Sequence, residues 1–433
     1  MAHKEKNKET LISWKEIASY LGCKVRTCQR WEKEGGLPVH RYLESSKSRV
    51  FAYKHELDDW MKSKAQSRPK NTGKYAAVLI LAVALTFIYF AFIRSPSLSQ
   101  PHDFRIEGSE LIILDKNKHE LGRFDSGLKN LQNEEFYRNH FQVKSQSKTH
   151  RDLELPLIMI RDIDPDHQKE VLFSPITVIQ KKTGQLFCLS DKGEVKWMFN
   201  TKQEIVFGQK SYTVDFIRGF TLTDILGDES PEVMVIAEAG FMFPTQVIIL
   251  DHKGKPLKEY WNSGRINDFS FCDVDKDGQK EILLAGRNNE YDKGCLIVLE
   301  SDFQTGGSPQ TGYYKSPELK QGIEKYYILF PTTKVGSENF VRDPLARIHI
   351  MDEETIIAES YSGIYFEFDL DFKLKEIRFS DLYENLHSEA YQEGWVREEF
   401  SPKVMAELKS ELMPKVLYYN RNNWTHISSM VKK

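Results

Sequence analysis

The sequence predicts a multidomain protein: a small, mainly α-helical domain with a β-hairpin, one transmembrane helix, and a large all-β domain with a short helical C-terminal segment. Three observations predict this division. Basic residues concentrate at the N-terminal end, one long uncharged apolar run follows, and short β-rich segments then recur along the rest of the chain. With 433 residues, 40% of them apolar, and five cysteines, the chain is neither disordered nor a small disulfide scaffold.

Charge separates the two ends of the chain. Residues 1–74 hold 17 Lys and Arg against 9 Asp and Glu, whereas the remaining residues hold 43 against 54. The overall net charge of −3 hides this division. The N-terminal end is therefore expected to prefer anionic partners.

The apolar run Tyr75–Ile93 is predicted to be a transmembrane helix. It carries no charge, and at about 1.5 Å per residue it spans roughly 28 Å, close to a bilayer core. A cleavable signal peptide is excluded because the residues before the run have the pattern of a folded domain. Residues 64–74 form a basic linker, and no basic residue stands between Arg94 and Arg105. The N-terminus is therefore expected in the cytoplasm and the C-terminal domain outside a bacterial cytoplasmic membrane.

Residues 11–33 predict two short helices joined by a tight turn at Gly22. Ser13 and Glu16 form a capping box at the start of the first helix. Apolar residues recur at helical spacing in both helices: Trp14, Ile17, Ala18 and Leu21 in the first, and Val25, Cys28 and Trp31 in the second.

The next residues predict a β-hairpin and a third helix. Strand-like runs at 39–43 and 49–53 flank a turn-rich segment with a basic tip. The segment KHELDDWMKS then places Leu57, Trp60 and Met61 on one helical face, which closes a small core.

The phrases VRTCQRWEKEGGLP and SRVFAYKHELDDWM resemble winged helix-turn-helix domains of the MerR and phage-excisionase type, over about residues 10–63. In such domains the second helix enters the major groove and the wing contacts the backbone or minor groove. An alternative is a solvated module that binds a protein. The resemblance implies DNA binding by these residues: Lys24, Arg26, Thr27, Gln29 and Arg30 on the helix, and Arg41, Lys47 and Arg49 on the wing.

A nine-residue acidic pattern occurs three times in the C-terminal part: DIDPDHQKE (162–170), DILGDESPE (224–232) and DVDKDGQKE (273–281). Acids stand at positions 1, 5 and 9 of each copy, and an apolar strand follows directly. Carboxylates at alternate positions of a tight loop suit Ca²⁺, and Gly278 permits the sharp bend in the third copy. The alternative is an Asx-type turn that holds no metal.

A second element also repeats, in which an apolar strand, an acid with a turn, and another strand follow one another. It occurs five times, as LIILDKNKHELGRF, LFCLSDKGEVKWMF, VIILDHKGKPLKEYW, LIVLESDFQTGG and IYFEFDLDFKLKEIRF. Five hairpins indicate about five blades. Together the two elements resemble FG-GAP (VCBS-type) repeats of β-propellers, within an exported domain of residues 105–433. The resemblance implies a Ca²⁺ cofactor with these ligands: Asp273, Asp275, Asp277 and Glu281 in the third loop, and Asp162, Asp164, Asp166 and Glu170 in the first.

The remaining features concern packing. Residues 382–394 and 401–412 look helical, and a final strand with a turn at 420–423 is expected to close the propeller near Leu111. Cys188, Cys272 and Cys295 are interpreted as small buried hydrophobes. The aromatic loops near 241–243 and 313–327 are interpreted as core or rim packing, with a ligand face as the alternative.

The sequence contains no phosphate-cradling glycine loop, HExxH, GxSxG or CxxC, so the chain is not expected to be an enzyme. The predicted function is a single-pass, membrane-bound, DNA-binding transcriptional regulator. Its calcium-binding propeller would sense an unknown extracytoplasmic ligand, and a homodimer would gain avidity on a palindromic operator. One alternative is an envelope binding or adhesion protein whose N-terminal module binds a cytoplasmic protein. A membrane-anchored hydrolase is the other.

Overall fold

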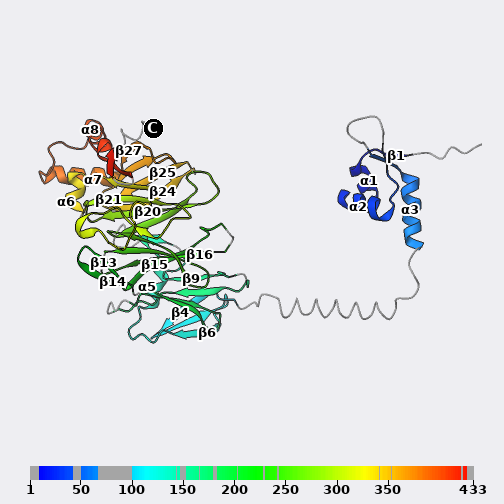
Figure 1. Ribbon diagram of the computed structural model, residues 1–433, viewed down its shortest axis with the longest axis horizontal. Helices are drawn as coiled ribbons and strands as arrows, with labels where there is room; N and C mark the ends of the chain where they lie inside the picture. The colour runs from blue at the N-terminus through cyan, green and yellow to red at the C-terminus, as the bar shows by residue number, and fades with distance from the viewer. Residues whose placement is uncertain are drawn as a thin grey trace, which may run out of the picture. The chain divides into compact units, whose positions relative to one another are not determined.

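The computed structural model describes residues 9–41, 50–66, 100–142, 144–146, 153–164, 166–178, 183–201, 203–227, 230–240, 243–340, 342–352, 354–420 and 423–426. The chain forms two compact units, residues 1–95 and 96–433 (Figure 1). The predicted transmembrane helix 75–93 lies outside the described residues. Within the described ranges, no helix is long and apolar enough to cross a membrane.

The N-terminal unit contains three helices and a three-stranded sheet in the order β1-β3-β2. The helices are α1 (Trp14–Tyr20), α2 (Val25–Gly35) and α3 (Lys54–Gln66), and the strands are β1 (Thr10–Leu11), β2 (His40–Arg41) and β3 (Val50–Tyr53). Ser13 caps α1 as predicted, because its side chain accepts a hydrogen bond from the Glu16 N–H at 3.2 Å. Gly22 adopts φ +62° in the turn between α1 and α2, a conformation that favours glycine. The short strand β1 was not predicted.

The predicted apolar faces build the small core of this unit. Ile17, Ala18, Cys28, Leu37, Ala52 and Leu57 are buried together, and Trp14, Trp31 and Trp60 pack against them. Met61 is an exception, because its side chain is 40% exposed. Helix α3 continues to Gln66, beyond this core and three residues into the predicted linker.

The C-terminal unit consists mainly of antiparallel sheets, each formed by strands that follow one another in the chain. The first sheet is β4-β5-β6 (Asp103–Glu107, Glu110–Leu114, Glu120–Asp125). The second is β9 to β12 (Ile158–Arg161, Glu170–Phe173, Gln185–Leu189, Val195–Asn200). The third is β15 to β18 (Phe216–Thr223, Glu232–Glu238, Thr245–Leu250, Pro256–Asn262) with β22 (Gly306–Gly307).

The fourth sheet is β19, β20, β21, β23, β28 and β29 (Ile266–Cys272, Glu281–Asn288, Lys293–Leu299, Tyr326–Phe330, Leu417–Asn420, Asn423–His426). The fifth is β24 to β27 (Leu345–Met351, Thr355–Ser360, Ile364–Phe368, Leu374–Phe379). Two hairpins stand apart, β7-β8 (Ser145–Gln146, Leu153–Glu154) and β13-β14 (Gln203–Phe207, Lys210–Val214). Short helices connect or cover the sheets: α5 (Glu134–Asn139), α6 (Lys334–Asn339), α7 (Asp381–Gln392) and α8 (Pro402–Leu412).

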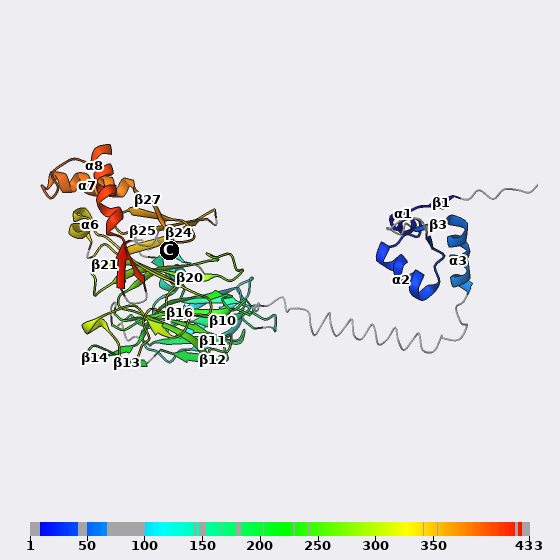
Figure 2. The same ribbon diagram turned by 45° about the horizontal axis from the view of Figure 1, so that its top comes forward.

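Neighbouring sheets pack face to face in chain order. One apolar cluster joins the first three sheets, a second joins the third and fourth, and a third joins the fourth and fifth. Up-and-down antiparallel sheets that bury both faces against their neighbours are the blades of a propeller-like fold. Figures 1 and 2 both show β27, α7 and α8 at one end of this unit. Toward the other end, Figure 1 shows β4 and β6, and Figure 2 shows β11 and β12.

Two details of the predicted topology are wrong. The final hairpin does not pair near Leu111, because β28 pairs with β23 and extends the fourth sheet. The fourth predicted hairpin does not form either. After β21 the chain leaves the sheet, its two-residue strand β22 pairs in parallel with β18 of the third sheet, and β23 takes the expected place beside β21. An insertion between repeats therefore changes which strands meet.

The three cysteines of this unit are buried and free, as predicted. Burial raises the pKa of Cys295 to about 12, so the thiol stays neutral at physiological pH.

Glu324 makes the stability of the C-terminal unit depend on pH. Its carboxylate accepts a hydrogen bond from the Tyr260 hydroxyl at 2.6 Å, and burial raises its pKa to about 7. A pKa above the ordinary value means that the folded state holds the proton more tightly. The resulting stability is complete below about pH 4.5 and is lost as pH rises through 7. We expect the free energy of unfolding to fall by about 2–3 kcal/mol across this window. In urea titrations Glu324→Gln should remove that part of the pH dependence, and an unchanged profile would contradict the assignment.

Candidate functional site

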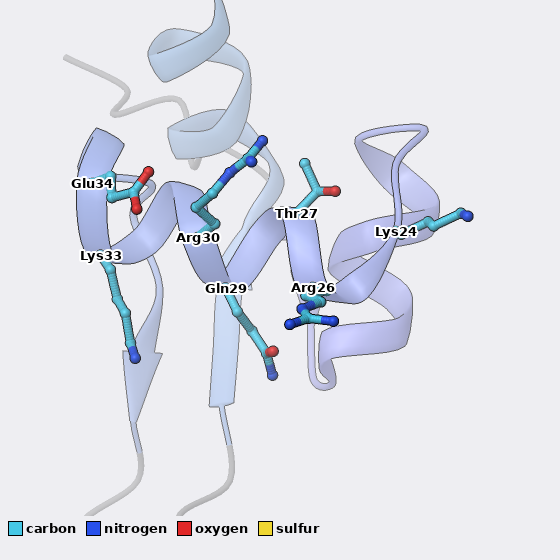
Figure 3. A pocket seen from close by; sticks show the side chains of 7 residues that line it. All are labelled: Lys24, Arg26, Thr27, Gln29, Arg30, Lys33 and Glu34. Atoms are coloured by element: carbon cyan, nitrogen blue, oxygen red, sulfur yellow. The ribbon is translucent and has the colours of Figure 1, made fainter. Parts of the chain in front are cut away.

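One face of α2 carries most of the predicted DNA-binding residues (Figure 3). This face borders a shallow groove of about 520 Å³, which is lined by Lys24, Arg26, Thr27, Gln29, Arg30, Lys33 and Glu34. All five residues predicted on this helix are therefore brought together. Lys33 was missed, although its spacing of seven residues from Arg26 could have placed it on the same face.

The opposite face of α2 fixes the helix to its unit. Cys28 is fully buried, and Val25 and Trp31 pack against the same core. The Cys28 thiol lies 3.1 Å from the Cys23 sulfur. Burial, followed by this neighbour, raises the pKa of Cys28 to about 12, so the packed face stays uncharged. Polar and apolar residues are thus divided between the two sides of one helix.

The cations on the outer face form no ion pair within the described part of the chain, although the Glu34 carboxylate lines the same groove. Neither Arg26 nor Arg30 forms an ion pair with any described residue, and both are exposed. Arg41 differs, because its guanidinium lies 2.6 Å from the Glu32 carboxylate. Lys47 and Arg49 lie outside the described residues. Positive charge is therefore available on α2, whereas Arg41 is neutralised within the unit.

The three acidic loops occupy equivalent places in successive sheets. Each connects the first strand of its sheet to the second: β9 to β10, β15 to β16, and β19 to β20. The glutamate at position 9 starts the second strand and is buried in every copy. Its carboxylate accepts the backbone N–H of position 2 at 2.9–3.0 Å, in the pairs Glu170–Ile163, Glu232–Ile225 and Glu281–Val274. This bond pins each loop to its strand.

Three of the four predicted ligands converge in the first loop and in the third. Ligand atoms of Asp162, Asp164 and Glu170 lie within 4.8 Å of one another, as do those of Asp273, Asp275 and Glu281. Asp166 and Asp277 are not part of these clusters and accept backbone N–H bonds within their loops, and Asp166 also lies 3.4 Å from the Lys196 ammonium. The oxygen chemistry of the clusters suits a hard cation.

A lysine ammonium already lies among these oxygens. Lys196 on β12 is 2.6 Å from Asp164 and 2.8 Å from Glu170. Lys325 is 2.7 Å from Glu281 and also contacts Asp275. Burial alone would lower the pKa of each lysine, but the bonds to the carboxylates outweigh it and raise both pKa values. The carboxylates of both clusters thus suit a cation. In each cluster, however, the lysine ammonium already occupies the place that a metal ion would take. Calcium binding itself stays a prediction.

The aromatic loops meet at the opposite edge of the sheets, because β16 and β20 run from the acidic loops toward them. Phe243 contacts Tyr212 with ring centroids 5.0 Å apart, and the Tyr212 hydroxyl lies 3.0 Å from that of Tyr313. Beside these rings lies a cleft of about 550 Å³, lined by Lys210, Ser211, Tyr212, Thr213, Ala239, Gly240, Phe243, Arg287 and Asn289. Both charged residues in this lining are cations. Burial, then the neighbouring Arg342 and Arg265, lowers the pKa of Arg287.

No protein-family model matches the chain, and no curated protein matches its sequence. Among solved structures it is similar to the C-terminal WD40 domain of Sif2, with 10% identity over 64% of this chain and 54% of that one, at a TM-score of 0.31. It is also similar to the Dos1 propeller (12% identity, 61% and 62% covered, TM-score 0.30) and to BamB from Moraxella catarrhalis (11%, 63% and 69%, 0.26). The chain spans less than two thirds of the first two of these. The propeller-like fold follows from the order of the sheets given above.

Proposed function

We propose that the protein is a single-pass, membrane-bound, DNA-binding transcriptional regulator with a propeller-like sensor outside the membrane. The observation that carries the proposal is the outer face of α2, where exposed cations without an ion partner in the described chain surround Thr27 and Gln29. Arginine and glutamine can bond base edges, whereas lysine mostly positions a protein on phosphates. With β2 and β3 as the wing, we interpret residues 10–63 as a winged helix-turn-helix domain.

Binding of the full-length protein to genomic DNA fragments tests this proposal. In a gel-shift titration we expect affinity to fall steeply between low and moderate salt, because bound phosphates release counterions. Binding that is absent or insensitive to salt would overturn it. The first alternative, an adhesion protein with a protein-binding N-terminal module, predicts no gel shift. The absence of enzymatic activity stays a prediction, and a substrate screen on the full chain tests the hydrolase alternative.

The membrane arrangement rests on residues 75–93 and the basic residues that precede them. Reporters fused to the two ends test it in cells. A cytoplasmic reporter should be active at the N-terminus and silent at the C-terminus, and activity at both ends would place the two units in one compartment. Analytical ultracentrifugation with and without DNA tests the proposed homodimer.

For the sensor we propose that the cleft beside Tyr212 and Phe243 binds the ligand, a small anion that carries an apolar or aromatic ring. Lys210 and Arg287 would meet the charge and the two rings would pack against the apolar part. A thermal-shift screen of aromatic carboxylates and acidic sugars should give ligands that stabilise the protein. Arg287→Gln should abolish the shift. Lys255→Gln, in a turn at the opposite edge of the third sheet, should keep it. A shift that survives Arg287→Gln would place the ligand elsewhere.

A further inference from the structure

Two of the acidic loops meet a lysine from a later part of their own sheet: Lys196 lies on the edge strand β12, and Lys325 directly precedes β23. In both cases the lysine contacts position 3 and position 9 of the loop: Asp164 and Glu170 for Lys196, Asp275 and Glu281 for Lys325. The ammonium groups reach these oxygens across 26 and 44 residues of chain. The same pair of positions is thus neutralised in the same way in two different sheets.

The side-chain environments show that these contacts are partly shielded from water. The side chain of Lys325 is 17% exposed and that of Lys196 is 31% exposed, while both partner glutamates are almost fully buried. Each lysine makes a third contact, Lys325 with Glu300 at 3.2 Å and Lys196 with Asp166 at 3.4 Å. An ammonium donates up to three hydrogen bonds, so the three carboxylates around Lys325 satisfy it.

The second acidic loop provides an internal comparison. Its position 3 is Leu226 instead of an aspartate. In the β11–β12 ladder a bulge places Lys196 between two successive residue pairs, so that no β11 residue lies opposite it. A bulge at the equivalent place of the β17–β18 ladder puts Leu257 in the same position relative to β17. Leu257 therefore occupies the place of Lys196. The aspartate of the loop and the lysine of the edge strand are thus replaced together, whereas Glu232 keeps its bond to the loop.

We propose that Lys196 and Lys325 take the place of the calcium ion that the loop pattern implies, so that the first and third loops are held by lysine and fold without metal. Calcium binds oxygen ligands at about 2.3–2.6 Å, so an ion at either cluster and the ammonium would need the same oxygens. Two cations cannot share them, and calcium would have to expel the lysine. The proposal concerns the stability of the C-terminal unit and is independent of DNA binding by α2.

The test compares thermal unfolding of the full-length protein in EDTA, Mg²⁺ and Ca²⁺. The midpoint of the unmodified protein should be the same in all three. Lys325→Leu and Lys196→Leu should each lower the midpoint in EDTA by roughly 2–4 °C, because carboxylates are left without a partner. Millimolar Ca²⁺, but not Mg²⁺, should restore it, since calcium accepts the irregular oxygen cluster more readily. Lys192→Leu, in the exposed turn before Lys196, is the matched control and should change nothing.

A double variant separates the lost contact from a general defect in folding. Asp164→Leu combined with Lys196→Leu reproduces the pair found in the second sheet. It should regain most of the midpoint lost in Lys196→Leu and should not respond to Ca²⁺. The proposal is overturned if Ca²⁺ stabilises the unmodified protein by several degrees, or if the lysine variants are as stable in EDTA as the parent. A double variant less stable than Lys196→Leu would also overturn it.

Discussion

Replacing Arg26 and Arg30 together with alanine should weaken DNA binding of the full-length protein at least tenfold. Both residues line the groove on the outer face of α2, as Gln29 does, and neither forms an ion pair with a described residue (Figure 3). Loss of an arginine that bonds a base edge costs about 1–3 kcal/mol, and loss of a phosphate contact weakens binding to all sequences. Gel-shift titrations at several salt concentrations measure the loss. The variant should also show a shallower dependence of affinity on salt, because fewer counterions are released.

The matched control removes the same charge from another helix. Lys62→Ala with Lys64→Ala lowers the positive charge of α3 by two and leaves α2 intact. This variant should keep most of the affinity. If both double variants lose affinity equally, binding depends on net charge alone and α2 is not the reading element. Glu32→Ala adds a further test, because it frees Arg41 from its ion pair. If β2 belongs to a DNA-contacting wing, this variant should bind more tightly at low salt.

Helical periodicity was sufficient to predict the N-terminal unit. Apolar residues three and four apart placed Ile17 and Cys28 in one core, and Ser13 gave the start of α1. The pairing of Arg41 with Glu32 could not be predicted, because it depends on the tertiary placement of β2 beside the end of α2 that carries Glu32. The strand β1 has only two residues, too few for an alternating pattern, and forms because β3 offers it a free edge.

The repeats predicted the sheets of the C-terminal unit for a similar reason. Each apolar run followed by an acidic turn marks a place where the chain reverses, and four of the five predicted hairpins formed. The fourth failed because residues 300–325 interrupt it, and spacing alone does not show which later strand returns to the sheet. The contacts of Lys196 with the first loop and of Lys325 with the third were not predicted, for a related reason. These contacts depend on the register of β12 and on where β23 begins, and no local pattern in the sequence points to them.

Glu281→Ala should destabilise the C-terminal unit by about 3 kcal/mol or more. Glu281 is almost fully buried, and its carboxylate accepts both the Val274 N–H at 2.9 Å and the Lys325 ammonium at 2.7 Å. Alanine would leave a buried donor and a partly buried cation without this partner, and both losses are costly. Urea unfolding of the full-length protein, followed by far-ultraviolet circular dichroism, measures the change. Asp277→Ala in the same loop should cost less than about 1 kcal/mol, because Asp277 is exposed and its side chain accepts one backbone N–H there.

Glu281→Gln separates the two contacts of this side chain. The amide oxygen of glutamine can still accept the Val274 N–H, but the negative charge that faces Lys325 is gone. If the backbone bond is the main contribution, the glutamine variant should be nearly as stable as the parent. If the ion pair is the main contribution, its loss should approach that of alanine. Glu232 makes the same backbone bond in a sheet whose position 3 is leucine, so Glu232→Gln provides a comparison. A larger loss at position 281 than at position 232 would indicate that the negative charge contributes more where it contacts Lys325.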